Sequence, residues 1–283
     1  MRAVLLIDNG SKRPDSTLNL RTIADALSAR SGELVRPVSL LHSDQVQAEQ
    51  LAGQAADTFA PMLGRLLADG VRDLVLIPLF FGPSRALSQF VPETAATLAV
   101  EFGPFRLAIA PELCPLPQGE PRLVEILLDN LNVAATSAGI APKRVILVDH
   151  GSPIPEVTAV RRWLGDRLAL RLGPQVELEQ AVMERRPGIE YDFNGPLLED
   201  RLARLAETDP TTPILLSMLF LSAGRHAGPD GDIARIRARI EQGCPTLRLH
   251  TAPLVGLHPG LIEILESRLM EMSRWRRLTP GAD

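Results

Sequence analysis

The sequence contains an internal repeat of two copies. Three separate stretches of the first half recur in the second half at nearly constant spacing, between 138 and 141 positions later. Spacing that stays constant across most of a chain is typical of a duplicated structural unit, because an insertion or a different fold would break it. The matching pairs are Val4–Ser11 with Val145–Ser152, Leu79–Ala86 with Leu219–His226, and Pro121–Leu127 with Pro259–Leu265.

Within each copy, short apolar and β-branched runs alternate with longer segments of helical period. This alternation predicts an α/β fold of two similar halves, each a parallel four-stranded sheet flanked by helices. The Ser-, Gly- and Pro-containing stretch Thr136–Lys143 predicts a linker, so the expected domains are 1–138 and 139–283. The expected strands are 2–8, 34–41, 73–80, 105–110, 144–149, 175–183, 213–221 and 246–251. The expected helices are 14–30, 46–69, 88–101, 120–135, 155–171, 196–207, 230–242 and 259–273, and the chain after Arg277 is expected to fray.

Composition narrows the class of protein. A net charge of −4 and an aromatic content of 4% argue against nucleic-acid binding. No apolar run of about 18 residues is present, so no membrane partner is expected. The N-terminus enters a strand pattern without a signal-peptide layout, which favours a cytoplasmic location. Cys114 and Cys244 are too few and too far apart for a disulfide scaffold or a thiolate metal cluster.

Three possible metal ligands follow three successive strands of the second copy. His150 follows the run that ends at Asp149, Glu184 follows Val176–Met183, and His226 follows the run that ends at Leu221. The carboxyl ends of parallel strands meet at one edge of a sheet, so these side chains are expected to converge there. Two imidazoles and a carboxylate suit Fe²⁺, Co²⁺, Ni²⁺ or Zn²⁺ and do not suit Mg²⁺ or Ca²⁺. A structural role for each histidine remains the alternative.

The residues next to the three possible ligands indicate that the entrance to the site attracts anions. The backbone N–H groups of Gly151 and Ser152 stand near a helix start, where anions are favoured. Arg225, Arg185 and Arg186 would add positive charge, which fits a polycarboxylate ligand.

Two of these residues recur in the first copy, so a structural role remains an alternative for each. Arg225 recurs as Arg85, so it could instead bond carbonyls of its own loop. Asp149 recurs as Asp8, so it is either a turn residue or a partner that orients His150.

The first copy lacks the donor set. Asn9 stands where the second copy has His150, Ala86 where it has His226, and His42 is aligned with Glu184. Loss of two ligands predicts a scaffold half and a working half, although His42 could still assist a neighbouring site.

The paired motifs Asp149–Ser152 and Leu219–His226 resemble those of the CbiX/SirB sirohydrochlorin chelatases, the small type II tetrapyrrole chelatases. The resemblance implies two chelatase-like halves that face each other across a cleft. It also implies insertion of Co²⁺ or Fe²⁺, with Ni²⁺ as a further option, into sirohydrochlorin or a related tetrapyrrole on the way to cobalamin or siroheme. The metal would be a substrate, no organic cofactor is expected, and the protein would be a monomer or a homodimer. Position by position, His150, His226 and Glu184 take the metal and catalytic roles, and Ser152, Arg225 and Gly151 lie at the tetrapyrrole.

Two rival readings remain. The first is a non-catalytic carrier or regulatory protein for a metal or a tetrapyrrole. It is suggested by the loss of the possible ligands from the first copy. The second is an unrelated α/β enzyme, which is disfavoured because the sequence has no Walker loop, GxGxxG or GxSxG motif.

Overall fold

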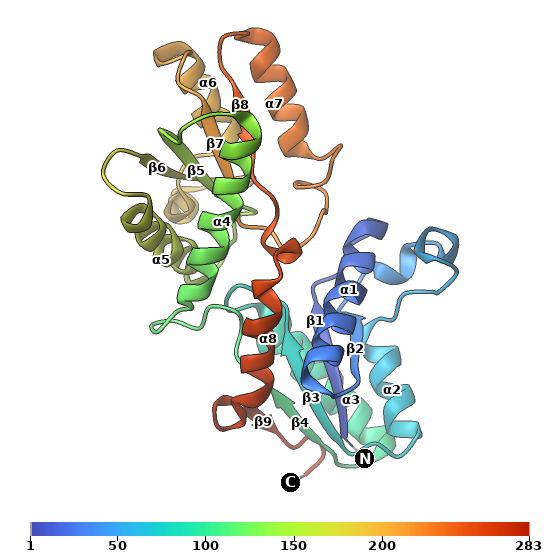
Figure 1. Ribbon diagram of the computed structural model, residues 1–283. Helices are drawn as coiled ribbons and strands as arrows, with labels where there is room; N and C mark the ends of the chain where they lie inside the picture. The colour runs from blue at the N-terminus through green and yellow to red at the C-terminus, as the bar shows by residue number, and fades with distance from the viewer. Residues whose placement is uncertain (1, 283) are drawn as a thin grey trace. The chain divides into compact units, whose positions relative to one another are not determined.

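The computed structural model describes residues 2–282 and divides into two compact units (Figure 1). The first unit holds the chain as far as Pro115 together with the segment from Ile262 onward, and the second unit is Leu116–Leu261. The units therefore do not coincide with the continuous halves 1–138 and 139–283 that the repeat predicts. No helix among residues 2–282 is long and apolar enough to cross a membrane.

Each unit is built on one sheet. The strand order is β2-β1-β3-β4-β9 in the first unit and β6-β5-β7-β8 in the second. All neighbouring strands run parallel except β9, which is antiparallel to β4. The strands are β1 (Arg2–Asp8), β2 (Val35–Ser39), β3 (Asp73–Pro78), β4 (Arg106–Ile109), β5 (Arg144–Asp149), β6 (Glu177–Val182), β7 (Ile214–Met218), β8 (Leu249–Thr251) and β9 (Arg276–Leu278).

Helices flank both sheets, which confirms the predicted α/β class. A five-residue π-turn, Ala86–Phe90, leads into the third helix. The α-helices are α1 (Pro14–Ser31), α2 (Phe59–Ala68), α3 (Val91–Phe102), α4 (Pro121–Ala138), α5 (Pro155–Leu172), α6 (Leu198–Thr208), α7 (Asp232–Gly243) and α8 (Gly260–Met270).

Two local predictions were wrong. The segment 46–69 is not one helix, because Ala52 and Gly53 adopt positive φ angles of 57° and 79° that end a short 3-10 turn, and α2 begins only at Phe59. The chain after Arg277 does not simply fray. β9 pairs with β4, and Trp275 before it is buried and donates from Nε1 to the Arg268 carbonyl. A three-residue strand is too short to show a period of two in sequence.

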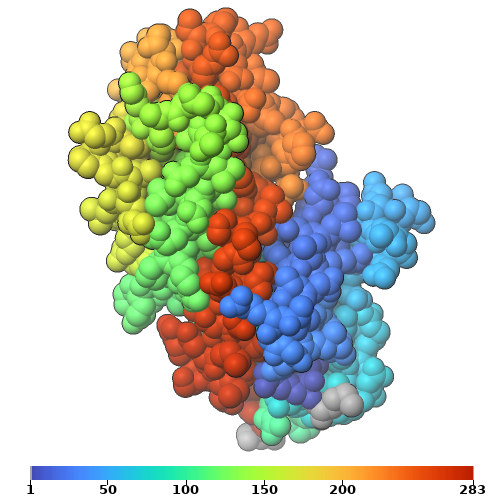
Figure 2. All heavy atoms as spheres, in the orientation of Figure 1, coloured from blue at the N-terminus to red at the C-terminus, as the bar shows by residue number. Residues whose placement is uncertain are grey.

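The last helix of each copy is exchanged between the units. α4 ends the first copy, yet it packs against α5, β7 and β8 of the second unit and lies on the surface there, in green in Figure 2. From Ile262 onward, α8 belongs to the first unit, where Arg268 donates to the carbonyls of Glu112 and Leu113. Sequence repeats report which segments are related, and they do not report which sheet a terminal helix covers.

In the second sheet the strand order reverses at β5. The chain leaves β5 for β6 on one side and then crosses to β7 on the other, so β5 lies between them. In open parallel sheets this arrangement opens a crevice at the carboxyl ends of the strands, because the loops from β5 and β7 turn to opposite faces. His150 follows β5 directly and His226 lies in the loop after β7.

The two copies treat the last residue of their first strand differently. Asp8 in the first unit and Asp149 in the second are both buried. Asp149 pairs with Arg161 of α5, whereas Leu20 of α1 stands at the corresponding position in the first unit. Burial without a cation raises the pKa of Asp8 from 3.8 to about 6, although hydrogen bonds from Ser39 and Gly10 offset part of the shift.

This unpaired carboxyl predicts a pH-dependent stability. Because the folded pKa of Asp8 lies above 3.8, its contribution to stability is fully present below about pH 4 and is lost as pH rises through about 6. At about 1.4 kcal/mol per pKa unit, a shift of this size corresponds to about 3 kcal/mol. We expect Asp8→Asn to raise the unfolding free energy at pH 7.5 and to change it little at pH 4. Urea titrations at both pH values measure this, and an equal effect at both would contradict it.

Candidate metal centre

The three predicted ligands lie together. Nε2 of His150 is 3.4 Å from Oε1 of Glu184, and Nε2 of His226 is 3.9 Å from Oε2 of the same carboxylate. One ligand atom from each residue can be chosen so that all lie within 4.8 Å of one another. The two imidazole rings have centroids 4.6 Å apart and meet edge to face at 75°. Three successive strand ends therefore bring two nitrogens and a carboxylate around one point.

The two histidines differ in their environments. The side chain of His150 is 58% exposed, whereas that of His226 is 5% exposed. Both ring nitrogens of His226, Nδ1 and Nε2, are buried and have no hydrogen-bond partner within residues 2–282. An imidazole nitrogen that is buried without a partner loses its hydration, and coordination to a metal ion would restore a bond to it.

The Nδ1 atoms of the two rings have different neighbours. Nδ1 of His150 lies 3.1 Å from the carbonyl oxygen of Gly151, which makes Nδ1 the protonated nitrogen of the neutral ring. Nδ1 of His226 lies 2.9 Å from Oδ2 of Asp232, the first residue of α7. In both rings Nε2 is the nitrogen that faces Glu184. The Asp232 contact has the distance of an ion pair without hydrogen-bond geometry, so it places negative charge behind the His226 ring.

Asp232 was missed in the sequence. It stands six positions after His226 and follows Gly231 at the start of a helix, where an acidic residue is ordinary because it favours the helix dipole. Only the folded loop shows that its carboxylate also reaches the imidazole. Asp232 further pairs with Nε of Arg225 at 3.2 Å and with Nη1 of Arg235 at 3.2 Å.

Of the predicted basic residues, one lies at the centre. Nη1 of Arg225 is 3.7 Å from Oε2 of Glu184, and its side chain is 72% exposed. Arg185 turns away and pairs with Asp192 at 3.0 Å. The guanidinium of Arg186 lies 5.9 Å from the ring of Tyr191. The positive charge beside the donors therefore comes from Arg225.

Gly151 is required by a close approach of two backbones. Its φ is +89°, and a Cβ atom built on it would lie 2.0 Å from the carbonyl oxygen of Glu184. The N–H group of Glu184 donates to the carbonyl of His150 at 3.0 Å, which ties two ligands together through the backbone. Any other residue at position 151 would separate these loops.

The N–H groups of Gly151 and Ser152, for which the sequence predicts an anion, have acceptors within the protein. The N–H of Gly151 donates to Oδ1 of Asp149 at 3.1 Å, and the N–H of Ser152 donates to Oδ1 of Asn194 at 3.0 Å. The hydroxyl of Ser152 accepts from the N–H of Ile154 at 3.0 Å. The Gly151 N–H is thus used within the loop and the Ser152 N–H by Asn194 of another segment. Asp149 is a turn residue and makes no bond to the His150 ring.

A buried polar clamp holds the loops that carry the ligands. Nη1 of Arg161 donates to Oδ1 of Asp149 at 2.7 Å, and Nη2 donates to the carbonyl of Asn194. Asn194, which is fully buried, accepts from Thr158 and returns a bond from Nδ2 to the carbonyl of Ser152 at 2.9 Å. The loop after β5 is thereby fixed to the segment between β6 and α6.

The environment of His226 favours the neutral form of its imidazole. Burial lowers the pKa of His226 below 6.5, and the neighbouring His150 lowers it further, while the carboxylates of Glu184 and Asp232 act in the opposite direction. A histidine binds a metal only in its neutral form, so this shift keeps the ligand available in mildly acidic solution.

Among its described residues, the first unit holds no equivalent centre. Its backbone repeats the second unit closely, because the N–H of Leu41 donates to the carbonyl of Asn9 as that of Glu184 does to His150. The structural counterpart of Glu184 is therefore Leu41, and the sequence alignment of Glu184 with His42 was wrong by one residue. Within residues 2–282, the group around His150 is the one triad of His, Cys, Asp or Glu close enough to hold a metal ion.

Comparison with known protein families gives one match for each of the two sequence copies. The family model described as CbiX matches residues 3–132 and 144–272, once for each copy. The chain belongs to the CbiX family. Both the family resemblance and the duplication predicted from sequence are confirmed by this double match. A search of curated proteins by sequence finds no match.

Solved structures confirm the chelatase-like fold. SirB from Bacillus subtilis with Fe³⁺ has a TM-score of 0.68 and 16% identity, over 96% of this chain and 95% of that one. A structure of CbiX described as the terminal enzyme of siroheme biosynthesis in denitrifying bacteria has a TM-score of 0.57 and 15% identity, over 95% and 97%. DR2241 from Deinococcus radiodurans, a multi-domain protein, has a TM-score of 0.60 and 16% identity, over 100% of this chain and 56% of that one.

Removing Arg161 should unfold the second unit more readily. Arg161→Leu leaves the Asp149 carboxylate buried without its cation, so we expect the unfolding free energy to fall by about 3–5 kcal/mol. The double variant Arg161→Leu/Asp149→Asn should recover most of that loss, because no charge remains buried. Chemical denaturation of the three proteins measures the effect. A single variant as stable as the parent would contradict the clamp.

The His226 imidazole should titrate below the ordinary histidine range. In the metal-free protein, NMR titration of the His226 ring should give a pKa below 6.5, because burial and His150 both disfavour its charged form. We expect His150→Ala to move that pKa upward. A value above 6.5 in the parent protein would contradict the packing described for this ring.

Proposed function

We propose that this CbiX-family protein inserts a divalent metal, Co²⁺ or Fe²⁺, into sirohydrochlorin or a related tetrapyrrole, as a sirohydrochlorin cobalt- or ferrochelatase-like enzyme. The observation that carries this proposal is the convergence of His150, Glu184 and His226 at the strand ends of one unit. The donor set also suits Ni²⁺, and Irving–Williams ordering gives no choice among the three metals. The metal is a substrate, and no organic cofactor is needed.

The side chains divide the work of insertion. The Nε2 atoms of His150 and His226 would hold the incoming metal ion, with positions left open for the macrocycle. The insertion exchanges one M²⁺ for two protons of the pyrrole N–H groups, so a base must accept them. The carboxylate of Glu184 is 48% exposed and lies within 4 Å of both Nε2 atoms. It would accept one pyrrole proton, release it to solvent through its exposed side and then accept the second. Arg225 is suited to a substrate carboxylate, because an exposed guanidinium can form paired charge-assisted hydrogen bonds.

The unequal burial of the two imidazoles suits a metal that must leave. A structural metal site is closed by four protein ligands, whereas this site offers three donors, of which one histidine and the glutamate are exposed. On the exposed side, macrocycle nitrogens could replace His150 and Glu184 as ligands of the metal while the buried His226 remains bound to it.

Further parts of the proposal concern the setting. The proposed pathways are cobalamin or siroheme biosynthesis, in the cytoplasm. The protein would act as a monomer or homodimer, with the tetrapyrrole as partner and without nucleic acid or a membrane.

Anaerobic metalation of sirohydrochlorin with Co²⁺ or Fe²⁺, followed by absorbance, tests the proposal. We expect the rate to fall about 10- to 100-fold or more in His150→Ala and His226→Ala, since even loss of a residue behind a ligand has an effect of this size. His42→Ala is the matched control, because His42 is a histidine at a strand end of the unit without the donor set. Equal rates in all four proteins would reject the assignment.

A non-catalytic carrier is the second candidate, favoured by the unit in which Asn9, Leu41 and Ala86 replace the donors. It differs in one outcome. A carrier would bind Co²⁺ and the tetrapyrrole through the same histidines, and it would not accelerate insertion over the rate in buffer.

A further inference from the structure

The two sheets end differently at equivalent strands. The register of β3 with β4 pairs Leu74 with Leu107, and the register of β7 with β8 pairs Ile214 with Leu249, so β8 is the counterpart of β4. In the first unit β9 covers the outer edge of β4. Within residues 2–282, no strand pairs with the outer edge of β8.

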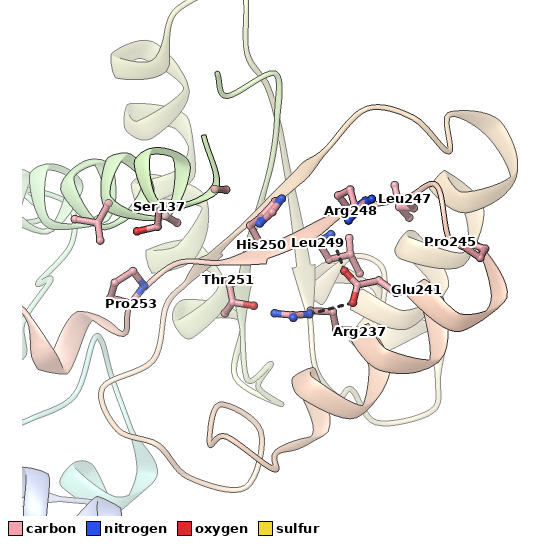
Figure 3. Close-up of a pocket in the computed structure, with 13 residues that line it drawn as sticks. Ser137, Arg237, Glu241, Pro245, Leu247, Arg248, Leu249, His250, Thr251 and Pro253 are labelled. Carbon is pink, nitrogen blue, oxygen red and sulfur yellow. Dashed lines mark hydrogen bonds and ion pairs between the residues drawn. The ribbon is translucent and has the colours of Figure 1, made fainter. Parts of the chain in front are cut away.

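The open edge of β8 has unused backbone groups. The carbonyl of Arg248 and the N–H of Ala252 bond to β7, so alternation turns the backbone groups of Leu249 and Thr251 outward. The N–H of Leu249 is capped by Oε1 of Glu241 at 3.0 Å, and Arg237 holds the other carboxylate oxygen at 3.3 Å (Figure 3). A side-chain carboxylate therefore occupies a position that a strand carbonyl would take.

A groove runs along this edge. It has a volume of about 720 Å³ and is bounded by α4, α7 and β8. In Figure 3, Ser137 approaches from α4 on one side and Arg237 and Glu241 approach from α7 on the other, with His250 and Thr251 between them. The counterparts of these elements in the first unit are α8, α3 and β4, and there β9 pairs with the strand.

The groove carries unbalanced positive charge. In the first unit Arg106 pairs with Asp73 at 3.4 Å. Pro213 stands at the position that corresponds to Asp73, and Arg248, the counterpart of Arg106, is exposed and makes no ion pair with any described residue. Arg237 is matched by Glu241, which leaves Arg248 as the free cation beside His250.

We propose that the groove beside β8 binds an extended acidic segment of a partner protein, which adds to the sheet as an antiparallel fifth strand and displaces Glu241 from the Leu249 N–H. β-Strand addition takes its affinity from main-chain hydrogen bonds and its specificity from alternate side chains. The β4–β9 pair supplies the register. An apolar residue would face Leu249 as Leu278 faces Leu107, and an acidic residue opposite His250 would lie beside Arg248.

Two blocked hexapeptide probes test the proposal on the full chain. One has the sequence of residues 275–280, and the other has the same sequence with both arginines replaced by glutamate. We expect the acidic probe to bind more tightly in fluorescence anisotropy at low salt, and to slow hydrogen exchange at the Thr251 amide. Arg248→Glu should weaken the acidic probe by roughly two- to tenfold, as loss and reversal of an exposed ion pair would.

Three further variants sharpen the result. Arg106→Glu, at the matched position of the first unit, should leave binding unchanged. Glu241→Ala should strengthen binding, because no carboxylate then competes for the Leu249 N–H. Thr251→Pro should abolish it, since proline removes an outward N–H that an edge strand can lose without unfolding.

Several outcomes would overturn the proposal. One is equal binding of both probes with no response to Arg248→Glu. Another is no binding of either probe at millimolar concentration. A third is sedimentation that shows a dimer disrupted by Thr251→Pro, which would assign the edge to a second copy of the chain.

Discussion

The candidate site of the second unit depends on the contacts that the Arg161 guanidinium makes with Asp149 and the Asn194 carbonyl. This side chain is 2% exposed, and it joins the end of β5, through Asp149, to the segment before α6, through the Asn194 carbonyl. A buried ion pair of this kind contributes little net stability over an apolar pair of the same shape, but it is costly to break. The first unit illustrates the alternative, because Leu20 replaces the arginine and Asp8 is left buried without a cation. The polar clamp therefore belongs to the copy whose loops must keep a fixed geometry.

Fixed loops give the donors their arrangement before any metal arrives. The Glu184 N–H binds the His150 carbonyl, and Gly151 allows the two backbones to touch. His226 comes from a different loop, and its Nδ1 lies 2.9 Å from Oδ2 of Asp232 at the start of α7. Ligands that are held by separate elements need little reordering on binding, so less of the coordination energy is spent on conformational entropy.

The sequence predicted most of the fold and the centre of the site. Strand runs that end at His150, Glu184 and His226 predict convergence, because parallel strands place their carboxyl ends together. Asp232 could not be found, since an acidic residue at a helix start is common. The bond from the Ser152 N–H to Asn194 could not be found either, because Asn194 is distant in sequence. Pairing by repeat also failed by one residue at β2 and β6, where backbone bonds identify Leu41 as the counterpart of Glu184.

Larger errors arose where tertiary packing decides. The exchange of α4 and α8 leaves no mark in a repeat, because both helices keep the same apolar periodicity whichever sheet they cover. β9 is three residues long and is stabilised by its place beside β4 and by the buried Trp275 before it. Segment 46–69 carries helical periodicity, yet the left-handed backbone at Ala52 and Gly53 interrupts it.

The exchange of helices also sets an order of assembly during translation. The second unit is one continuous segment, Leu116–Leu261, whereas the first unit needs the chain from Ile262 onward to finish its sheet and cover it. On the ribosome, the strands before Pro115 emerge well before the segment from Ile262 onward that completes their sheet, while the second unit can close earlier. The unit whose strands are synthesised earlier is thus the unit completed later.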